Sequence, residues 1–249
     1  MKKLVAALCG SLLIAASPAV MASSGAHLEP ADVDLSNQAS LQRGAKNFVN
    51  YCLNCHSATY MRYGRMGKDL GLDEAMLQDN LMFIPGKKVG ETMDVAMPHA
   101  LSESWFGVTP PDLSLVSRSR GADWLNTYLR SFYASEGRPF GVDNLVFAKV
   151  GMPNVLEELQ GVQKPVYVEK KGADGSSHQV IDKLELVSQG SLSPAEYDLF
   201  VRDLVNFMVY LGEPAQMQRK GIGLWVLLFL AVFTVLAYLL KLEYWKDIH

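Results

Sequence analysis

The chain contains the motif Cys52-Leu53-Asn54-Cys55-His56, which constrains its fold more than any other feature. Two thiols three residues apart can each form a thioether bond with one vinyl group of a haem, and a histidine directly after the second thiol can ligate the iron. The motif therefore supplies two covalent tethers and one axial ligand. A domain that contains a haem can pack loops against it, so a haem would explain how irregular stretches such as residues 85–111 are stabilised.

Three other interpretations of the motif compete with haem attachment. A thiol–disulfide oxidoreductase uses two cysteines at the same spacing, but there the motif normally opens a helix after a strand. Here the motif instead closes an apolar helical stripe that starts at Leu41. A structural zinc ion needs four ligands, and the chain has no second cysteine pair. The match could also be accidental, but the preceding helix and the export signal described next favour covalent haem.

The first 22 residues have the three parts of a secretory signal peptide. A lysine pair precedes an apolar run at residues 4–16, and small residues surround a predicted cleavage point after Ala22. As a helix this run rises only about 20 Å, which is short of a hydrocarbon core of about 30 Å, so an uncleaved anchor is the weaker interpretation. Cys9 lies in the run and leaves with it.

Residues 222–240 carry no charge and predict a transmembrane helix, because a helix of this length reaches about 28 Å. Basic residues flank the run and aromatic residues lie near both of its ends. We expect an anchor at 221–241, with a buried core helix as the alternative. The export signal orients it: the head, residues 23–220, lies in the periplasm, and the tail, residues 242–249, stays in the cytoplasm. The chain then crosses a bacterial inner membrane once.

Composition excludes several classes of protein. The 249 residues include 26 acidic and 23 basic side chains, for a formal net charge of −3, and 49% of them are hydrophobic. This mixture is too apolar for a disordered chain. The acidic excess argues against neutralising phosphates, so no nucleic-acid partner is expected. Three cysteines are too few for a disulfide scaffold.

The pattern of apolar residues predicts a mainly α-helical head with long loops. A helical stripe opens the segment 36–58 and leads into the haem motif, and another runs through residues 123–135. Ser193, followed by proline and glutamate, predicts a capped helix that continues to Gly212. Alternation of apolar and polar residues over 165–187, around a glycine-containing turn, predicts a small β-hairpin.

The sixth ligand of the iron is less constrained by spacing. Two methionines precede proline, Met97 and Met152, and the residue before proline disfavours helix, which suits a loop that presents a ligand. His99 offers a second histidine instead. The residue pattern leaves Met152 only modestly ahead. Arg118 and Arg120 are candidates to pair with haem propionates, although solvated surface arginines would look the same in the sequence.

Taken in order, these features resemble the cytochrome c1 family, the haem subunit of the bacterial cytochrome bc1 complex (ubiquinol–cytochrome c reductase). The resemblance covers essentially the whole mature chain. It rests on the haem motif, the Pro110-Pro111-Asp112-Leu113-Ser114 block leading to Arg120, the Gly151-Met152-Pro153 loop, the helix into Gly212-Glu213-Pro214, and the anchor. It implies a class I c-type cytochrome fold with one C-terminal transmembrane helix.

The resemblance also implies roles for individual residues. Cys52 and Cys55 form the thioether bonds to one haem c, His56 is the proximal iron ligand, and Met152 is the distal ligand. Three further residues would contact the haem: Arg120 pairs with a propionate, and Pro111 and Trp124 lie against the ring. This chain departs from the family pattern at two places. Members of the family often have tyrosine at the position of Trp124, and some stabilise the ligand loop with a pair of cysteines that this chain lacks.

The function implied is electron transfer in respiratory quinol oxidation. Electrons arrive from a Rieske iron–sulfur protein and leave to a c-type cytochrome, while the anchor packs against cytochrome b in a dimeric, membrane-embedded complex. The chain would be an enzyme only as a subunit of the reductase, without a catalytic pocket of its own. The alternatives are a membrane-anchored cytochrome of a terminal oxidase, a tethered electron shuttle, and a tethered thiol oxidoreductase.

Overall fold

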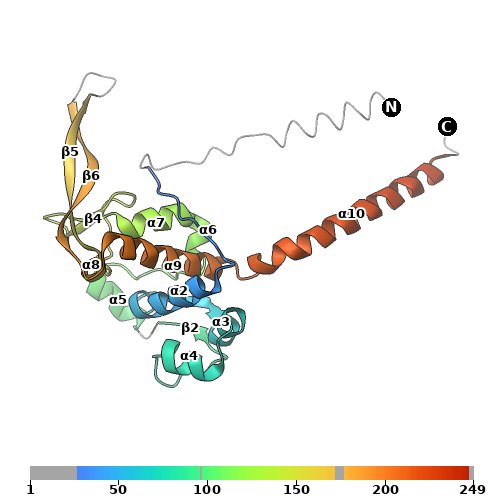
Figure 1. Cartoon of the computed structure of the whole chain (residues 1–249), viewed down its shortest axis with the longest axis horizontal. Helices are drawn as coiled ribbons and strands as arrows, with labels where there is room; N and C mark the ends of the chain where they lie inside the picture. The colour runs from blue at the N-terminus through green and yellow to red at the C-terminus, as the bar shows by residue number, and fades with distance from the viewer. Residues whose placement is uncertain (1–26, 96, 172–176, 247–249) are drawn as a thin grey trace.

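Two helices, α2 (Gln38–Tyr51) and α9 (Pro194–Gly212), form the centre of the head in the computed structural model (Figure 1). The structure describes residues 27–95, 97–171 and 177–246, so the predicted signal peptide lies outside it. The other elements of the head are short, apart from one hairpin. In chain order they are β1 (Ala58–Arg62), α3 (Tyr63–Leu70), α4 (Glu74–Leu81), β2 (Thr92–Met93), α5 (His99–Phe106), α6 (Val116–Arg120), α7 (Ala122–Arg130), β3 (Phe132–Ala134), β4 (Val142–Asn144) and α8 (Glu157–Gln160).

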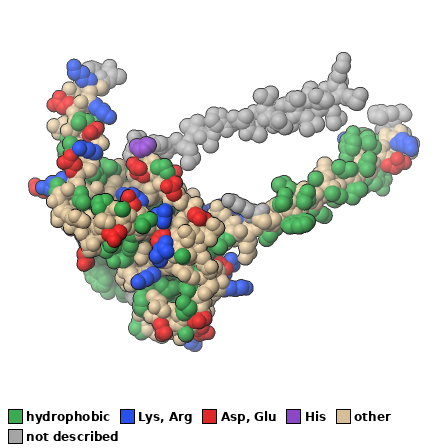
Figure 2. Space-filling model, in the orientation of Figure 1, with side chains coloured by type: hydrophobic (Ala, Val, Ile, Leu, Met, Phe, Trp, Pro, Cys, Tyr) green, Lys and Arg blue, Asp and Glu red, His purple; other side chains and the backbone are tan. Residues whose placement is uncertain are grey.

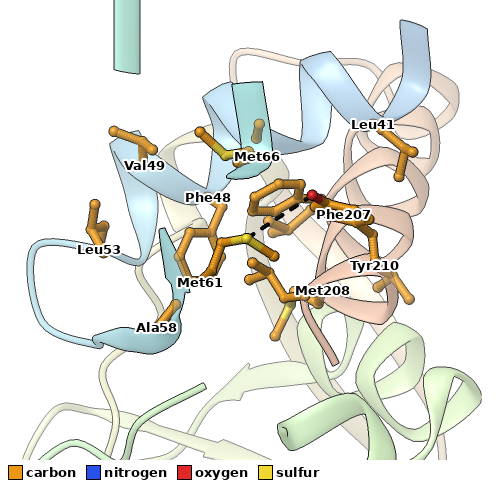
Figure 3. Close-up of a cluster of buried hydrophobic side chains, with 14 of the residues drawn as sticks. Leu41, Phe48, Val49, Leu53, Ala58, Met61, Met66, Phe207, Met208 and Tyr210 are labelled. Atoms are coloured by element: carbon orange, nitrogen blue, oxygen red, sulfur yellow. Dashed lines mark hydrogen bonds between the residues drawn. The ribbon is translucent and has the colours of Figure 1, made fainter. Parts of the chain in front are cut away.

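Helices α2 and α9 pack closely where a glycine of α2 meets the α9 backbone and an aromatic ring of each helix meets the other. A Cβ atom at Gly44 would lie 2.1 Å from the Asp203 carbonyl oxygen, so only glycine fits there. The Phe48 and Phe207 rings lie 5.5 Å apart between their centroids (Figure 3). Tyr210 is fully buried beside them, and its hydroxyl donates to the Asp69 carboxylate at 2.9 Å. This core supports the loops that build the site.

The ends of both central helices are fixed by local chemistry. The Asn37 side chain accepts from the Ser40 backbone N–H at the start of α2. At the start of α9, Ser193 and Glu196 form a reciprocal capping box with proline in the first turn. The capped helix that the sequence predicts from Ser193 to Gly212 is therefore confirmed.

Two segments differ from the sequence-based expectation. The helix expected over 123–135 ends at Arg130, because Phe132–Ala134 turns into strand β3 and pairs antiparallel with β4. An apolar stripe alone does not reveal that long-range pairing. The stretch 85–111, expected to be irregular, contains the eight-residue helix α5, which begins after Pro98 and ends at Gly107 in the left-handed region.

The predicted hairpin is confirmed and is longer than expected. Strand β5 (Gly161–Lys171) pairs antiparallel with β6 (Ser177–Gln189), with Val168 opposite Val180, and the ribbon projects from the head (Figure 1). Residues 172–176, which join the strands, lie outside the described residues.

The last helix, α10 (Gln216–Tyr244), runs away from the head as one continuous element (Figure 1). Its segment Gly221–Tyr244 is the one helix within the described residues that is long and apolar enough to cross a membrane, at about 36 Å. Hydrophobic side chains cover its visible surface (Figure 2). At its base, Glu213 bridges Arg118 of α6 and Arg219 of α10, so ion pairs join the anchor to the head.

Candidate haem site

A cavity of about 450 Å³ opens between the haem motif, α7, α9 and two loops. Most of its lining is apolar, and its volume lies within the usual range for small-molecule and cofactor sites, about 300–1,000 Å³. All seven residues predicted from the sequence line it, although they come from positions up to 100 residues apart. They are Cys52, Cys55, His56, Pro111, Arg120, Trp124 and Met152.

The haem motif follows directly from the end of α2. Cys52 caps the helix, and its N–H still donates to the Phe48 carbonyl at 2.9 Å. The chain then turns tightly, because the N–H groups of Cys55 and His56 both donate to the Cys52 carbonyl, at 3.1 and 2.8 Å. Helix end and turn together bring both cysteines and His56 to the lining of the cavity.

His56 is held in one tautomer by the opposite loop. Its Nδ1 lies 2.7 Å from the Pro111 carbonyl oxygen. Since a carbonyl can only accept, Nδ1 carries the proton and Nε2 keeps its lone pair free for a metal. Burial lowers the pKa of His56, while the Pro111 carbonyl and the Asp112 charge oppose that shift. The neutral, ligating form of the imidazole is therefore favoured.

Asp112 fixes the Pro111 loop against the motif, a role that the sequence does not reveal. Its Oδ2 accepts from the Ser57 hydroxyl at 2.8 Å and from both the backbone N–H and the hydroxyl of Thr59 at 2.9 Å. Its Oδ1 accepts from the Ser114 backbone N–H at 2.8 Å. Partial desolvation of this surface carboxylate opposes ionisation, but these hydrogen bonds outweigh it and lower the pKa of Asp112 to about 2. The carboxylate ties together the two segments whose contact orients His56.

Met152 lies on the loop between β4 and α8 and lines the same cavity as the motif. It packs against a small cluster of buried residues, Phe132, Val142 and Val150, which is separate from the main core. The Tyr128 hydroxyl donates to its Sδ at 3.4 Å. Met97, the other methionine before a proline, is not among the lining residues, and His99 begins α5. Of the two methionines, the structure therefore brings Met152 to the motif.

Asn144 organises the loop that carries Met152, and it too is absent from the sequence prediction. Its side chain is 1% exposed. The amide oxygen accepts from the backbone N–H groups of Val146 and Phe147, at 3.0 and 3.2 Å, and the amide nitrogen donates to the Tyr128 carbonyl at 2.8 Å. One buried amide thus joins the start of the loop to the end of α7.

The two candidate arginines have different surroundings. Arg120 lines the cavity, and its guanidinium carbon lies 5.1 Å from the centroid of the Trp124 ring. Trp124 in turn stacks on Tyr128 at 4.9 Å between centroids. Arg118 points elsewhere, to Glu213, with 3.1 Å between nitrogen and oxygen. Arg120 is therefore the arginine placed to meet an anionic group in the cavity.

Cys52 does not have the electrostatics of a redox-active thiol. Burial, and then the neighbouring Cys55, raise the pKa of Cys52 to about 12. A reactive cysteine needs a lowered pKa, as found near cations or at a helix N-terminus. Cys52 instead caps the C-terminus of α2. This environment argues against the thiol oxidoreductase interpretation.

The donor set fits haem c. One cavity is lined by two cysteines at the attachment spacing, an imidazole with a free Nε2, a thioether from a separate loop and an arginine beside an aromatic ring. A mainly helical head with this cavity, followed by an apolar anchor helix, defines a membrane-anchored c-type cytochrome.

Comparisons with known proteins agree with this class. The Cytochrome C1 family matches residues 33–248. Cytochrome c1 of Allochromatium vinosum is 52% identical over 250 residues, which cover 100% of both chains. A Nitrosomonas europaea protein described as ammonia monooxygenase gamma subunit is 47% identical over 240 residues, covering 96% of this chain and 97% of its own. Cytochrome c1 of Rhodobacter capsulatus is 24% identical over 277 residues, covering 94% and 96%. The chain belongs to the cytochrome c1 family, whose members carry covalent haem c.

Proposed function

We propose that this chain is the electron-transfer subunit of a bacterial cytochrome bc1 complex and holds one haem c between His56 and Met152. Cytochrome c1 is a subunit of ubiquinol–cytochrome c reductase, where its partners are cytochrome b and the Rieske iron–sulfur protein. The observation that carries the proposal is the single cavity lined by the attachment motif, His56 and Met152.

Four residues would hold the cofactor directly. Cys52 and Cys55 form its thioether bonds, His56 ligates the iron through Nε2, and Met152 ligates it through Sδ. When bound, haem c supplies one-electron redox chemistry at its iron. A histidine and methionine ligand pair is typical of electron-transfer haems with a raised potential.

Three further residues would complete the site. Arg120 pairs with a propionate, because it is the cavity-lining arginine and stands beside the Trp124 ring. Pro111 and Trp124 would lie against the cofactor, and the apolar lining of the cavity would limit its contact with water. The chain has no catalytic pocket of its own in this proposal, since quinol oxidation takes place in the other subunits.

The topology follows from the two ends of the sequence. The head lies in the periplasm after removal of residues 1–22, the anchor at 221–241 packs against cytochrome b, and residues 242–249 stay in the cytoplasm of a single-pass inner-membrane protein. The complex is dimeric. Electrons leave to a c-type cytochrome, and the net acidic chain favours an acceptor with a basic docking face.

Purification of the tagged full-length chain from detergent-solubilised membranes tests this function. We expect it to co-purify with a b-type cytochrome and a Rieske protein, and the tagged band to stain for haem on a denaturing gel. A chain that stains for haem but purifies with a terminal oxidase, or alone, would contradict membership of the bc1 complex. A band without haem would contradict the site itself.

A further inference from the structure

The Tyr128 side chain forms a hydrogen bond with the Met152 sulfur. Its hydroxyl oxygen lies 3.4 Å from Sδ, within hydrogen-bond range for sulfur, and Met152 Sδ is its acceptor among the described residues. Tyr128 and Met152 both line the cavity and both pack on the small cluster around Phe132.

The Tyr128 ring is fixed on several sides, so its hydroxyl has a defined position. It stacks on Trp124 with an interplanar angle of 11°, and it meets Phe132 and Phe147 edge to face at centroid distances of 5.1 and 6.4 Å. Its backbone carbonyl accepts from the buried Asn144 amide.

A thioether sulfur is a weak acceptor with two lone pairs. A hydrogen bond from Tyr128 uses one lone pair and leaves the other for a metal, so the two interactions are compatible. The bond also restricts rotation of a flexible, unbranched side chain, which matters because the loop has no cysteine pair to brace it.

We propose that the Tyr128 hydroxyl positions Met152 and raises the reduction potential of the site by hydrogen-bonding to the ligand sulfur. A donor on the sulfur withdraws electron density from it and so disfavours the oxidised, more electron-deficient state. This inference rests on the proposed ligation by Met152. Tyr128 is a positioning residue that acts through the methionine.

The test uses the full-length chain in the purified membrane complex and measures the potential by optical redox titration, together with the methionine-to-iron charge-transfer absorption of the oxidised form. In Tyr128→Phe we expect the potential to shift negative while the charge-transfer absorption remains. Replacement of Tyr128 by 3-fluorotyrosine keeps the ring and strengthens the donor, so it should shift the potential positive even if the phenylalanine variant assembles poorly.

Tyr197→Phe is the matched control. Tyr197 is also buried, and its hydroxyl donates to the Leu129 carbonyl at 2.7 Å, but it does not line the cavity. The reduction potential of the Tyr197→Phe variant should equal that of the unmodified chain. An unchanged potential in both Tyr128 variants would overturn the proposal. So would an equal shift from Tyr128→Phe in a Met152→Leu background, where no sulfur remains. Persistence of the charge-transfer absorption in Met152→Leu alone would instead refute the ligand assignment.

Discussion

The two segments that carry the proposed iron ligands, the motif with His56 and the loop with Met152, are stabilised by different interactions. On the His56 side, an exposed carboxylate, Asp112, accepts four hydrogen bonds and clamps a loop to the motif. On the Met152 side, a buried neutral amide, Asn144, joins the loop to α7, and a small apolar cluster supports the methionine. Exposed hydrogen bonds contribute little because water competes for the same groups, whereas a buried polar group left without partners is costly. The Met152 side should therefore be the more sensitive to substitution.

The largest expected effect is at Met152 itself. In Met152→Leu we expect complete loss of the methionine-to-iron charge-transfer absorption and a lower potential, because leucine offers no lone pair. The optical spectrum and redox titration of the purified complex measure both. Met97→Leu is the control and should change neither, since Met97 does not line the cavity. If Met97→Leu abolished the charge-transfer absorption and Met152→Leu left it intact, Met97 would be the ligand instead of Met152.

Removal of Asn144 should have the next largest effect. Asn144→Ala leaves the buried Val146 N–H, the part-buried Phe147 N–H and the Tyr128 carbonyl without this partner, which we expect to cost about 2–3 kcal/mol. The charge-transfer absorption should weaken while the haem stays covalently attached, because the cysteines lie on a different segment, at the end of α2. Thermal unfolding followed by haem absorption measures the loss.

Asn50→Ala provides the matched control for Asn144. Asn50 is exposed on α2 and donates only to the carbonyl one turn before it. We expect a change within about 0.5 kcal/mol. If the two variants were equally stable, the buried Asn144 amide would stabilise the fold no more than the exposed Asn50 amide, which would contradict the prediction.

Removal of Asp112 should have a smaller effect. Asp112→Ala deletes four hydrogen bonds, but the side chain is exposed, so we expect a loss of about 1 kcal/mol with the charge-transfer absorption intact. Asp182→Ala, at an exposed position on the hairpin, is the control. If the charge-transfer absorption were lost in Asp112→Ala but kept in Asn144→Ala, the His56 side would be the more sensitive to substitution, contrary to our expectation.

The smallest expected effect is a pH dependence that only the Asp112 side should show. The pKa of Asp112 is about 2 in the folded chain, below the usual value of about 3.9. A depressed carboxylate pKa stabilises the fold above the unfolded value, and the stabilisation is lost as the pH falls through the folded value. The stability difference between wild type and Asp112→Ala should therefore shrink between pH 4 and pH 2.5 in urea unfolding. The difference for Asn144→Ala should not, since an amide does not titrate.

The same contrast explains which features the sequence predicts. The motif, the capping box at Ser193 and the anchor are local patterns, so each is visible without the fold. The following proline marks both Met97 and Met152, so the residue pattern puts Met152 only modestly ahead, and the resemblance to a family strengthens that preference. Its place in the cavity comes from tertiary packing.

Long-range contacts account for what the sequence does not reveal. The partners of Asp112 lie 53–55 residues away at Ser57 and Thr59, and Asn144 reaches back 16 residues to Tyr128. No spacing rule signals such contacts. The pairing of β3 with β4 likewise ends a helix that the apolar stripe alone would extend past Arg130.

The most direct test of the central claim is the optical spectrum of the purified wild-type complex, recorded oxidised, reduced and after denaturation. If Cys52, Cys55, His56 and Met152 hold haem c, the oxidised protein shows the methionine-to-iron charge-transfer absorption, and haem colour stays with this chain after denaturation. A colourless denatured chain with two titratable thiols would contradict the account.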